Sequence, residues 1–131
     1  MANTPFTIAG HPQAPLYAGA DLSALENTFV KPGATEGQVV AVAAATDQPI
    51  GVLLDEPSAA GKVANVVQFG IYEVVAGAAV AYGALVQTDA SGRAITAVAT
   101  GYVVGRALQA AENAGEKIAV FINCINPWLK A

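Results

Sequence analysis

The sequence predicts an all-β protein: a small β-barrel or sandwich of short strands, with at most one or two short helices and an extended N-terminal arm. From residue 28 onward, short runs rich in Val and Ile alternate with Gly, Pro, Asp and Asn, which is the pattern of strands joined by turns. Long helical segments of the kind that separate the strands of βαβ units are missing from this pattern. We therefore expect one β-domain over residues 28–131, preceded by an arm over residues 1–27.

Eight segments have the composition of strands. They are Gln38–Ala45, Ile50–Leu54, Val63–Phe69, Tyr72–Val75, Leu85–Thr88, Ala94–Ala99, Val103–Leu108 and Lys117–Asn123. Between the last two lies "ALQAAENAGEK", whose composition is helical, so a short helix or a wide loop is predicted there. The segment "TDASGRA" is predicted to form a turn, because Asp89 can bond its own backbone and Gly92 can adopt a positive φ.

Two stretches of the chain resemble each other. "PIGVLLDEPSAAGKVANVVQ" begins at Pro49 and "VVGRALQAAENAGEKIAVFIN" begins at Val103, and both read as strand, polar loop, Gly, strand. Two hairpins of equal length look alike in any Gly-rich β protein, so a structural duplication and a coincidence both stay open. Either origin predicts two similar hairpins that face each other across one barrel or sandwich.

The N-terminal arm is the first candidate for an interface. Its three prolines interrupt any helix. Its apolar residues favour an arm laid against another surface, such as a neighbouring subunit, over a solvated tail. These candidate interface residues are Phe6, Ile8, Leu16 and Tyr17.

Trp128 is the other candidate interface residue. It follows the last predicted strand, in "NPWLKA". A terminal Trp either packs onto its own barrel or anchors a neighbouring chain. Burial of the aromatic ring is favourable in both arrangements, so both stay open.

The charge content predicts that part of the surface is covered by other chains. Charged residues make up 12% of the sequence, about half of the usual share of roughly 25%. A monomer with so few charges would leave apolar surface in water. The six Lys and Arg residues are scattered singly and the net charge is −4, which argues against nucleic-acid binding because that requires clustered cations.

No catalytic, cofactor-binding or metal site is predicted, and no small-molecule substrate. The single histidine, His11, sits in the arm without a partner set for nucleophilic catalysis or metal binding. "EPSAAGKV" departs from a phosphate-binding loop, since Glu56 stands where Gly is needed and Val63 where Ser or Thr is needed. Cys124, in the alternating "FINCIN", is predicted to be a buried, inert thiol.

The sequence shows no signal peptide and no run of the roughly 18 apolar residues that a membrane helix needs. We therefore expect that the protein does not contact a membrane. We also expect that it is synthesised in a cytoplasm.

Three segments together resemble the capsid cement or decoration proteins of tailed bacteriophages. They are "AVAAATDQPIGVLLDE", "VVQFGIYEVVAGAAVAYGALVQTDASGRAI" and "GYVVGRALQAAENAGEKIAVFIN". The resemblance implies a small β-domain that assembles, often as a homotrimer, on the outer surface of an icosahedral head. There it would clamp adjacent major capsid subunits against the pressure of packed DNA. It also implies a virion protein assembled in the host cytoplasm, without enzyme activity or cofactor.

Two other interpretations stay open. "AGAAVAYGALV" resembles the Gly and Val rhythm of biotinyl and lipoyl carrier barrels, but Lys62, the only internal candidate for modification, lacks the Met neighbours typical of that class. A phage tail or receptor-binding component would also be a Gly-rich β oligomer.

Overall fold

The structure, a computed structural model, describes residues 13–131. Within this range it contains strands and turns and no helix, so the predicted all-β class is confirmed. The strands are β1 (Gln13–Ala18), β2 (Phe29–Pro32), β3 (Gln38–Ala41), β4 (Gly51–Leu53), β5 (Val63–Val67), β6 (Phe69–Val75), β7 (Leu85–Thr88), β8 (Ala94–Thr96), β9 (Tyr102–Val103), β10 (Gly105–Ala107), β11 (Lys117–Asn123) and β12 (Trp128–Leu129).

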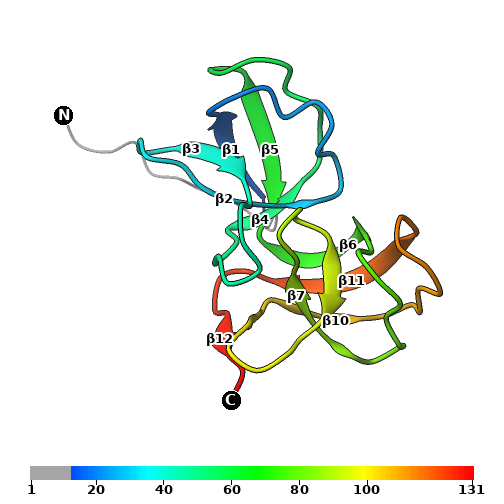
Figure 1. Cartoon of the computed structure of the whole chain (residues 1–131). Helices are drawn as coiled ribbons and strands as arrows, with labels where there is room; N and C mark the ends of the chain where they lie inside the picture. Colours follow the sequence, from blue (N-terminus) through cyan, green and yellow to red (C-terminus); the bar gives the residue numbers. More distant parts are fainter. Residues whose placement is uncertain (1–12) are drawn as a thin grey trace.

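The first five strands close into a small barrel in the order β1-β3-β2-β4-β5. It forms the upper part of the molecule in Figure 1. Closure leaves no free sheet edge along these strands, which removes a route to edge-to-edge aggregation. The barrel is narrow, and its interior is filled by small and branched side chains. They are Ala18, Leu22, Val30, Val39, Leu53, Ala64 and Val66.

Strand β1 lies within the range that the sequence analysis assigned to the arm. It pairs with β5 from Gln13 opposite Val67 to Tyr17 opposite Val63, and with β3 at its other edge. Pro15 is tolerated there because it lies opposite Asn65, whose carbonyl accepts a hydrogen bond from Leu54 instead. Residues 1–12 lie outside the described residues, so an extended arm over that segment stays a prediction.

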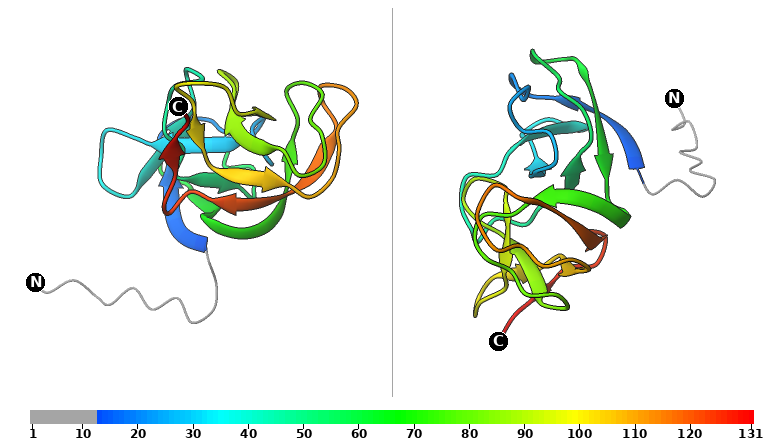
Figure 2. Two further views of the ribbon diagram at one scale, coloured as in Figure 1. Left: turned by 90° about the horizontal axis from the view of Figure 1, so that it is seen from below. Right: turned by 90° about the vertical axis from the view of Figure 1, so that its right-hand side faces the viewer.

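The second half of the chain forms a five-stranded sheet in the order β6-β11-β10-β7-β8. Figure 1 and the right-hand view of Figure 2 show this sheet below the barrel. The short strand β12, which pairs with β9, lies beside the C-terminus (Figure 1). The chain passes from barrel to sheet at Gln68, because β6 follows β5 after this one residue. Among the described residues, β5 and β6 therefore act as one bent strand that links both bodies.

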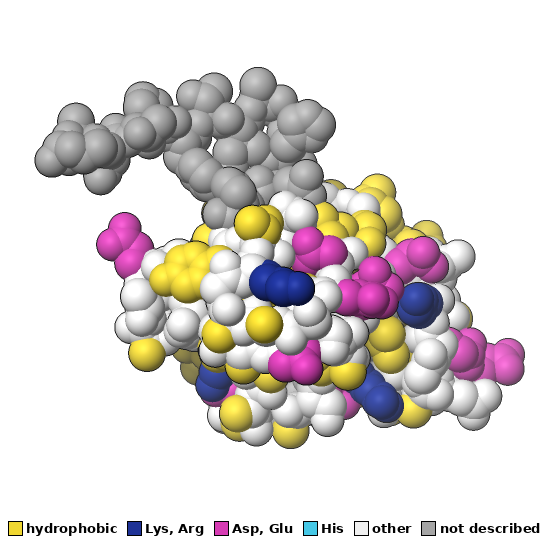
Figure 3. Space-filling model, turned by 90° about the horizontal axis from the view of Figure 1, so that it is seen from above, with side chains coloured by type: hydrophobic (Ala, Val, Ile, Leu, Met, Phe, Trp, Pro, Cys, Tyr) yellow, Lys and Arg dark blue, Asp and Glu magenta, His cyan; other side chains and the backbone are white. Residues whose placement is uncertain are grey.

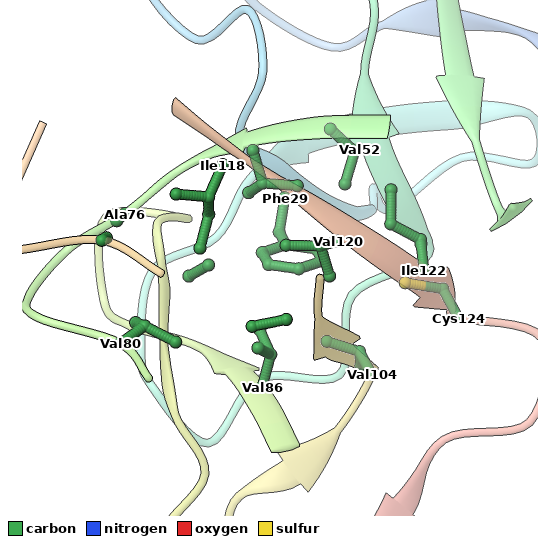
Figure 4. Close-up of a cluster of buried hydrophobic side chains, with 14 of the residues drawn as sticks. Phe29, Val52, Ala76, Val80, Val86, Val104, Ile118, Val120, Ile122 and Cys124 are labelled. Atoms are coloured by element: carbon green, nitrogen blue, oxygen red, sulfur yellow. The ribbon is translucent and has the colours of Figure 1, made fainter. Parts of the chain in front are cut away.

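The main hydrophobic core lies between the barrel and the sheet. Phe29 and Val52 project from the barrel strands and are fully buried against Val86, Val120 and Ile122 of the sheet (Figure 4). The side chains are mostly Val and Ala, so the backbones of the barrel and the sheet can approach closely. This shared core makes the barrel and the sheet one packed unit.

The two similar stretches do form two similar hairpins, β4–β5 and β10–β11. Both are antiparallel pairs, and the matching glycines Gly61 and Gly115 both have positive φ, of 89° and 94°. At Gly51 an added Cβ would overlap the carbonyl oxygen of Val67, and at Gly105 it would overlap that of Phe121. The hairpins belong to different sheets, one to the barrel and one to the five-stranded sheet.

Of the two forms predicted for residues 107–117, the structure has the wide loop. This loop is held by a bridge between Ala111 and Val80. Ala111 is 4% exposed, so this side chain packs into the core, whereas Ala110 and Ala114 stay exposed. The predicted turn at residues 88–94 is present, with Gly92 at a φ of 80° and the Asp89 carboxylate accepting hydrogen bonds from the backbone N–H groups of Ser91 and Arg93.

Candidate interaction surface

The five-stranded sheet has one buried face and one exposed face. Along β11, Ile118, Val120 and Ile122 point into the core, and Phe121 points away from it. Successive side chains of a strand project to opposite faces. The outer face of an ordinary exposed sheet is polar, so large apolar residues on this one require an explanation.

A row of paired residues crosses the outer face. Ile71 lies opposite Phe121, Phe121 opposite Arg106, and Arg106 opposite Leu85. The ring of Phe69 meets that of Phe121 edge to face, with centroids 5.2 Å apart. Three aromatic and aliphatic side chains are therefore contiguous on two neighbouring strands.

Trp128 extends this surface. It lines a shallow hollow of about 150 Å³ together with side chains of the sheet. The other lining residues are Leu85, Val103, Gly105, Arg106, Phe121 and Asn123. We call the exposed apolar residues Phe69, Ile71, Phe121 and Trp128 the sheet-face patch; their exposed fractions are 40%, 65%, 36% and 49%.

Arg106 places a cationic group beside the sheet-face patch. Its Nη1 donates a hydrogen bond of 2.8 Å to the carbonyl oxygen of Gly83, which fixes the guanidinium beside the hollow. Arg and aromatic side chains are both enriched at the centre of protein interfaces. The geometry of the sheet-face patch therefore fits a protein partner.

The cationic groups at the barrel end do not gather into one patch (Figure 3). In Figure 3, which views the barrel end, the Lys and Arg side chains stand apart from one another. Lys31 is used internally: its Nζ lies 3.0 Å from the Asp47 carboxylate. Two backbone N–H groups and Lys31 lower the pKa of Asp47, with the N–H of Ala43 as the largest cause. This arrangement stabilises the turn after β3.

The described residues offer little for chemistry. Burial raises the pKa of the Cys124 thiol to about 12, in agreement with the predicted inert thiol. Within residues 13–131, no group of three or more His, Cys, Asp or Glu side chains could hold a metal ion, and no helix in this range is long and apolar enough to cross a membrane. Lys62 is exposed on the β4–β5 loop, where its Nζ donates to the Ser58 hydroxyl at 3.0 Å.

The predicted interface residues lie in different places. Leu16 packs against the barrel core, and the Tyr17 hydroxyl donates to the Glu36 carbonyl at 2.9 Å. Trp128 belongs to β12, which pairs with β9, and its ring stays half exposed. Phe6 and Ile8 lie outside the described residues. An interface role for these five residues stays a prediction.

Sequence reasoning missed Phe69, Ile71 and Phe121 as surface residues. They stand in strands where both alternating positions are apolar, as in "VQFGIYEVV". Such a run reads as a strand buried on both faces. The signal that was available is the combination of this run with the low charge content, which indicates that the second face is covered by another chain.

Comparisons with known proteins identify the family of the chain. The model of a family described as phage cement protein matches residues 23–122. No curated protein matches the chain. A solved structure described as "The crystal structure of head fiber gp8.5 N base in bacteriophage phi29" has the same fold, with a TM-score of 0.68 and 17% sequence identity over 86% of this chain and 93% of that chain. The match over most of the β-domain shows that the chain belongs to the phage cement protein family, and that it is a structural protein of the phage capsid.

Proposed function

We propose that this protein binds the outer surface of an icosahedral phage head and clamps adjacent major capsid subunits against the pressure of the packed DNA. The family match over residues 23–122 carries the proposal. The similar fold of a head fibre base from bacteriophage phi29 supports a position on the head. An added layer that bridges two capsid subunits stabilises the intact shell relative to a ruptured one.

The sheet-face patch is the surface that contacts the capsid. It offers three aromatic rings and one aliphatic side chain, all partly exposed, and Arg106 beside them. Truncation of such anchors typically costs at least about 2 kcal/mol of binding free energy. Of the interface residues expected from the sequence, Trp128 lies within this patch.

The protein acts as a homotrimer and has no enzyme activity, no cofactor and no nucleic-acid, membrane or small-molecule partner. Its other partner is the major capsid protein, and assembly takes place in the host cytoplasm. A trimer that touches several capsid subunits gains avidity, because the second contact forms at a high effective concentration. A modest contact between each subunit and the capsid is then sufficient for stable attachment of the trimer.

Purified protein added to phage heads that lack it tests the proposal. We expect saturable binding and retention of DNA at higher temperatures than in undecorated heads. Phe121→Asp should abolish both effects, whereas Val63→Asp, at an exposed barrel position, should preserve them. Heads that neither bind the protein nor change in stability would refute the proposed function, and binding to tails instead would favour a tail component.

A further inference from the structure

The sheet-face patch poses a problem for the protein before it reaches a head. Phe69, Ile71, Phe121 and Trp128 are all partly exposed in the part of the chain that the structure describes. Contiguous exposed aromatic side chains promote non-specific association in water. A free, soluble protein therefore benefits from a cover on this patch.

The described chain begins beside the patch. Gln13 pairs with Val67, and Phe69 follows only two residues later. Strand β1 pairs with one edge of β5. From Gln68 onward β11 pairs with the chain instead, and the Gln68 carbonyl accepts the N–H of Cys124 at 2.9 Å. Along β6 this edge is occupied by β11, and the described chain begins close to Phe69.

The segment before Gln13 has the composition of such a cover. Residues 1–12 contain no Asp, Glu, Lys or Arg, so no side-chain charge other than that of His11 would have to be desolvated. Phe6 and Ile8 are large apolar residues that stand two positions apart, so they would share one face of this segment if it were extended. Phe6 lies seven residues before Gln13, a reach of about 24 Å when extended, which is enough to cross the neighbouring strands.

We propose that, in the free protein, Phe6 and Ile8 of the same chain lie on the sheet-face patch and cover it. The same chain is favoured over a second copy because a short tether gives a high effective concentration at its own patch. The inference rests on the proposed function in one respect, namely that the covered patch is the surface later offered to the capsid. Its tests use the free protein without heads, so its failure leaves the proposed function untouched.

The single tryptophan provides the first test, because it lies within the patch. In the full-length chain, Phe6→Ser with Ile8→Ser should shift Trp128 emission to the red and raise the acrylamide quenching constant about twofold, since the indole loses an apolar cover. The matched control is Thr4→Ser with Thr7→Ser, which should change neither. Unchanged emission and quenching in the Phe6 and Ile8 variant would overturn the proposal.

A cysteine pair provides the second test and identifies the occupant. Phe6→Cys with Ile71→Cys should form a disulfide within one chain under mild oxidation, at a yield that does not depend on protein concentration. The native Cys124 does not compete, because its raised pKa of about 12 keeps the thiol protonated. The control pairs Phe6→Cys with Val63→Cys, an equally exposed position at the far end of β5, which should stay reduced. Disulfides only between two chains, or equal yields for both pairs, would overturn the proposal.

Discussion

The side-chain amide of Asn27 donates a hydrogen bond to the backbone carbonyl of Glu73, 3.0 Å away. This contact joins the barrel to the sheet, because Asn27 also donates its backbone N–H to Leu53 and accepts the N–H of Val75. Asn27 is 5% exposed and has a φ of 65°. The backbone conformation, the side-chain amide and the position of Asn27 therefore all contribute to the contact between the barrel and the sheet.

Asn27→Ala should therefore lower the free energy of unfolding by about 2–3 kcal/mol, from the lost hydrogen bond and the cost of a left-handed backbone for Ala. Asn27→Gly loses the amide but tolerates the positive φ, so it should be less destabilised than the Ala variant. Denaturant unfolding measures both. Equal stability of the two variants would show that backbone conformation does not contribute.

Gly101→Ala should destabilise the fold through Gln87. An added Cβ at residue 101 would overlap the Oε1 atom of Gln87. That side chain is 2% exposed, and its Oε1 accepts the N–H of Val98 at 2.8 Å, so it has no free room to move. We expect a loss of about 1–3 kcal/mol, as for other overpacked sites.

A double-mutant cycle checks the mechanism of the Gly101 effect. Gly101→Ala should cost much less in a Gln87→Ala background, because the overlapping atom is gone. Additive costs in chemical denaturation would place the origin of the effect elsewhere.

Acidification should weaken the turn at Asp47. Hydrogen bonds from the N–H of Ala43, the side chain of Lys31 and the N–H of Ala44 lower the folded-state pKa of Asp47 below its ordinary value of 3.8. A carboxylate with a lowered pKa stabilises the fold above its unfolded pKa, and this stabilisation is lost as the pH falls through the folded pKa. The stability of the wild-type protein should fall below pH 3.8 more steeply than that of Asp47→Asn. Parallel pH profiles for the two proteins would contradict this assignment.

Truncation of Phe121 should weaken head binding. Phe121→Ala removes the ring that contacts Phe69 at the centre of the patch, and the loss of one such anchor corresponds to about a 30-fold rise in Kd. Sedimentation of labelled protein with undecorated heads measures this. Val63→Ala serves as the control and should bind like the wild type. A Kd for Phe121→Ala within the error of the wild type would show that the capsid contact lies on another surface.

The sequence predicted the fold class well because its signals are local. Gly61, Gly92 and Gly115 mark turns, and all three have positive φ. The helical composition of residues 107–117 did not decide the local structure, because Ala111 is drawn into the core by its bridge to Val80. Tertiary packing overrode a weak intrinsic propensity.

The candidate site was less accessible to sequence reasoning. Trp128 was predicted as an interface candidate because it is a terminal Trp, and the structure places it in the hollow beside Phe121. Phe69 and Phe121 meet only after β6 and β11 pair, 52 residues apart in the chain. The choice of exposed face depends on which side of the sheet packs against Phe29 and Val52, and no local pattern encodes that.

Cryo-electron microscopy of undecorated heads incubated with the purified protein tests the central claim most directly. The account predicts new density on the outer surface that spans adjacent capsid subunits, with the sheet that carries Phe121 and Trp128 facing the shell. Heads without added density, or density confined to the tail, would contradict it.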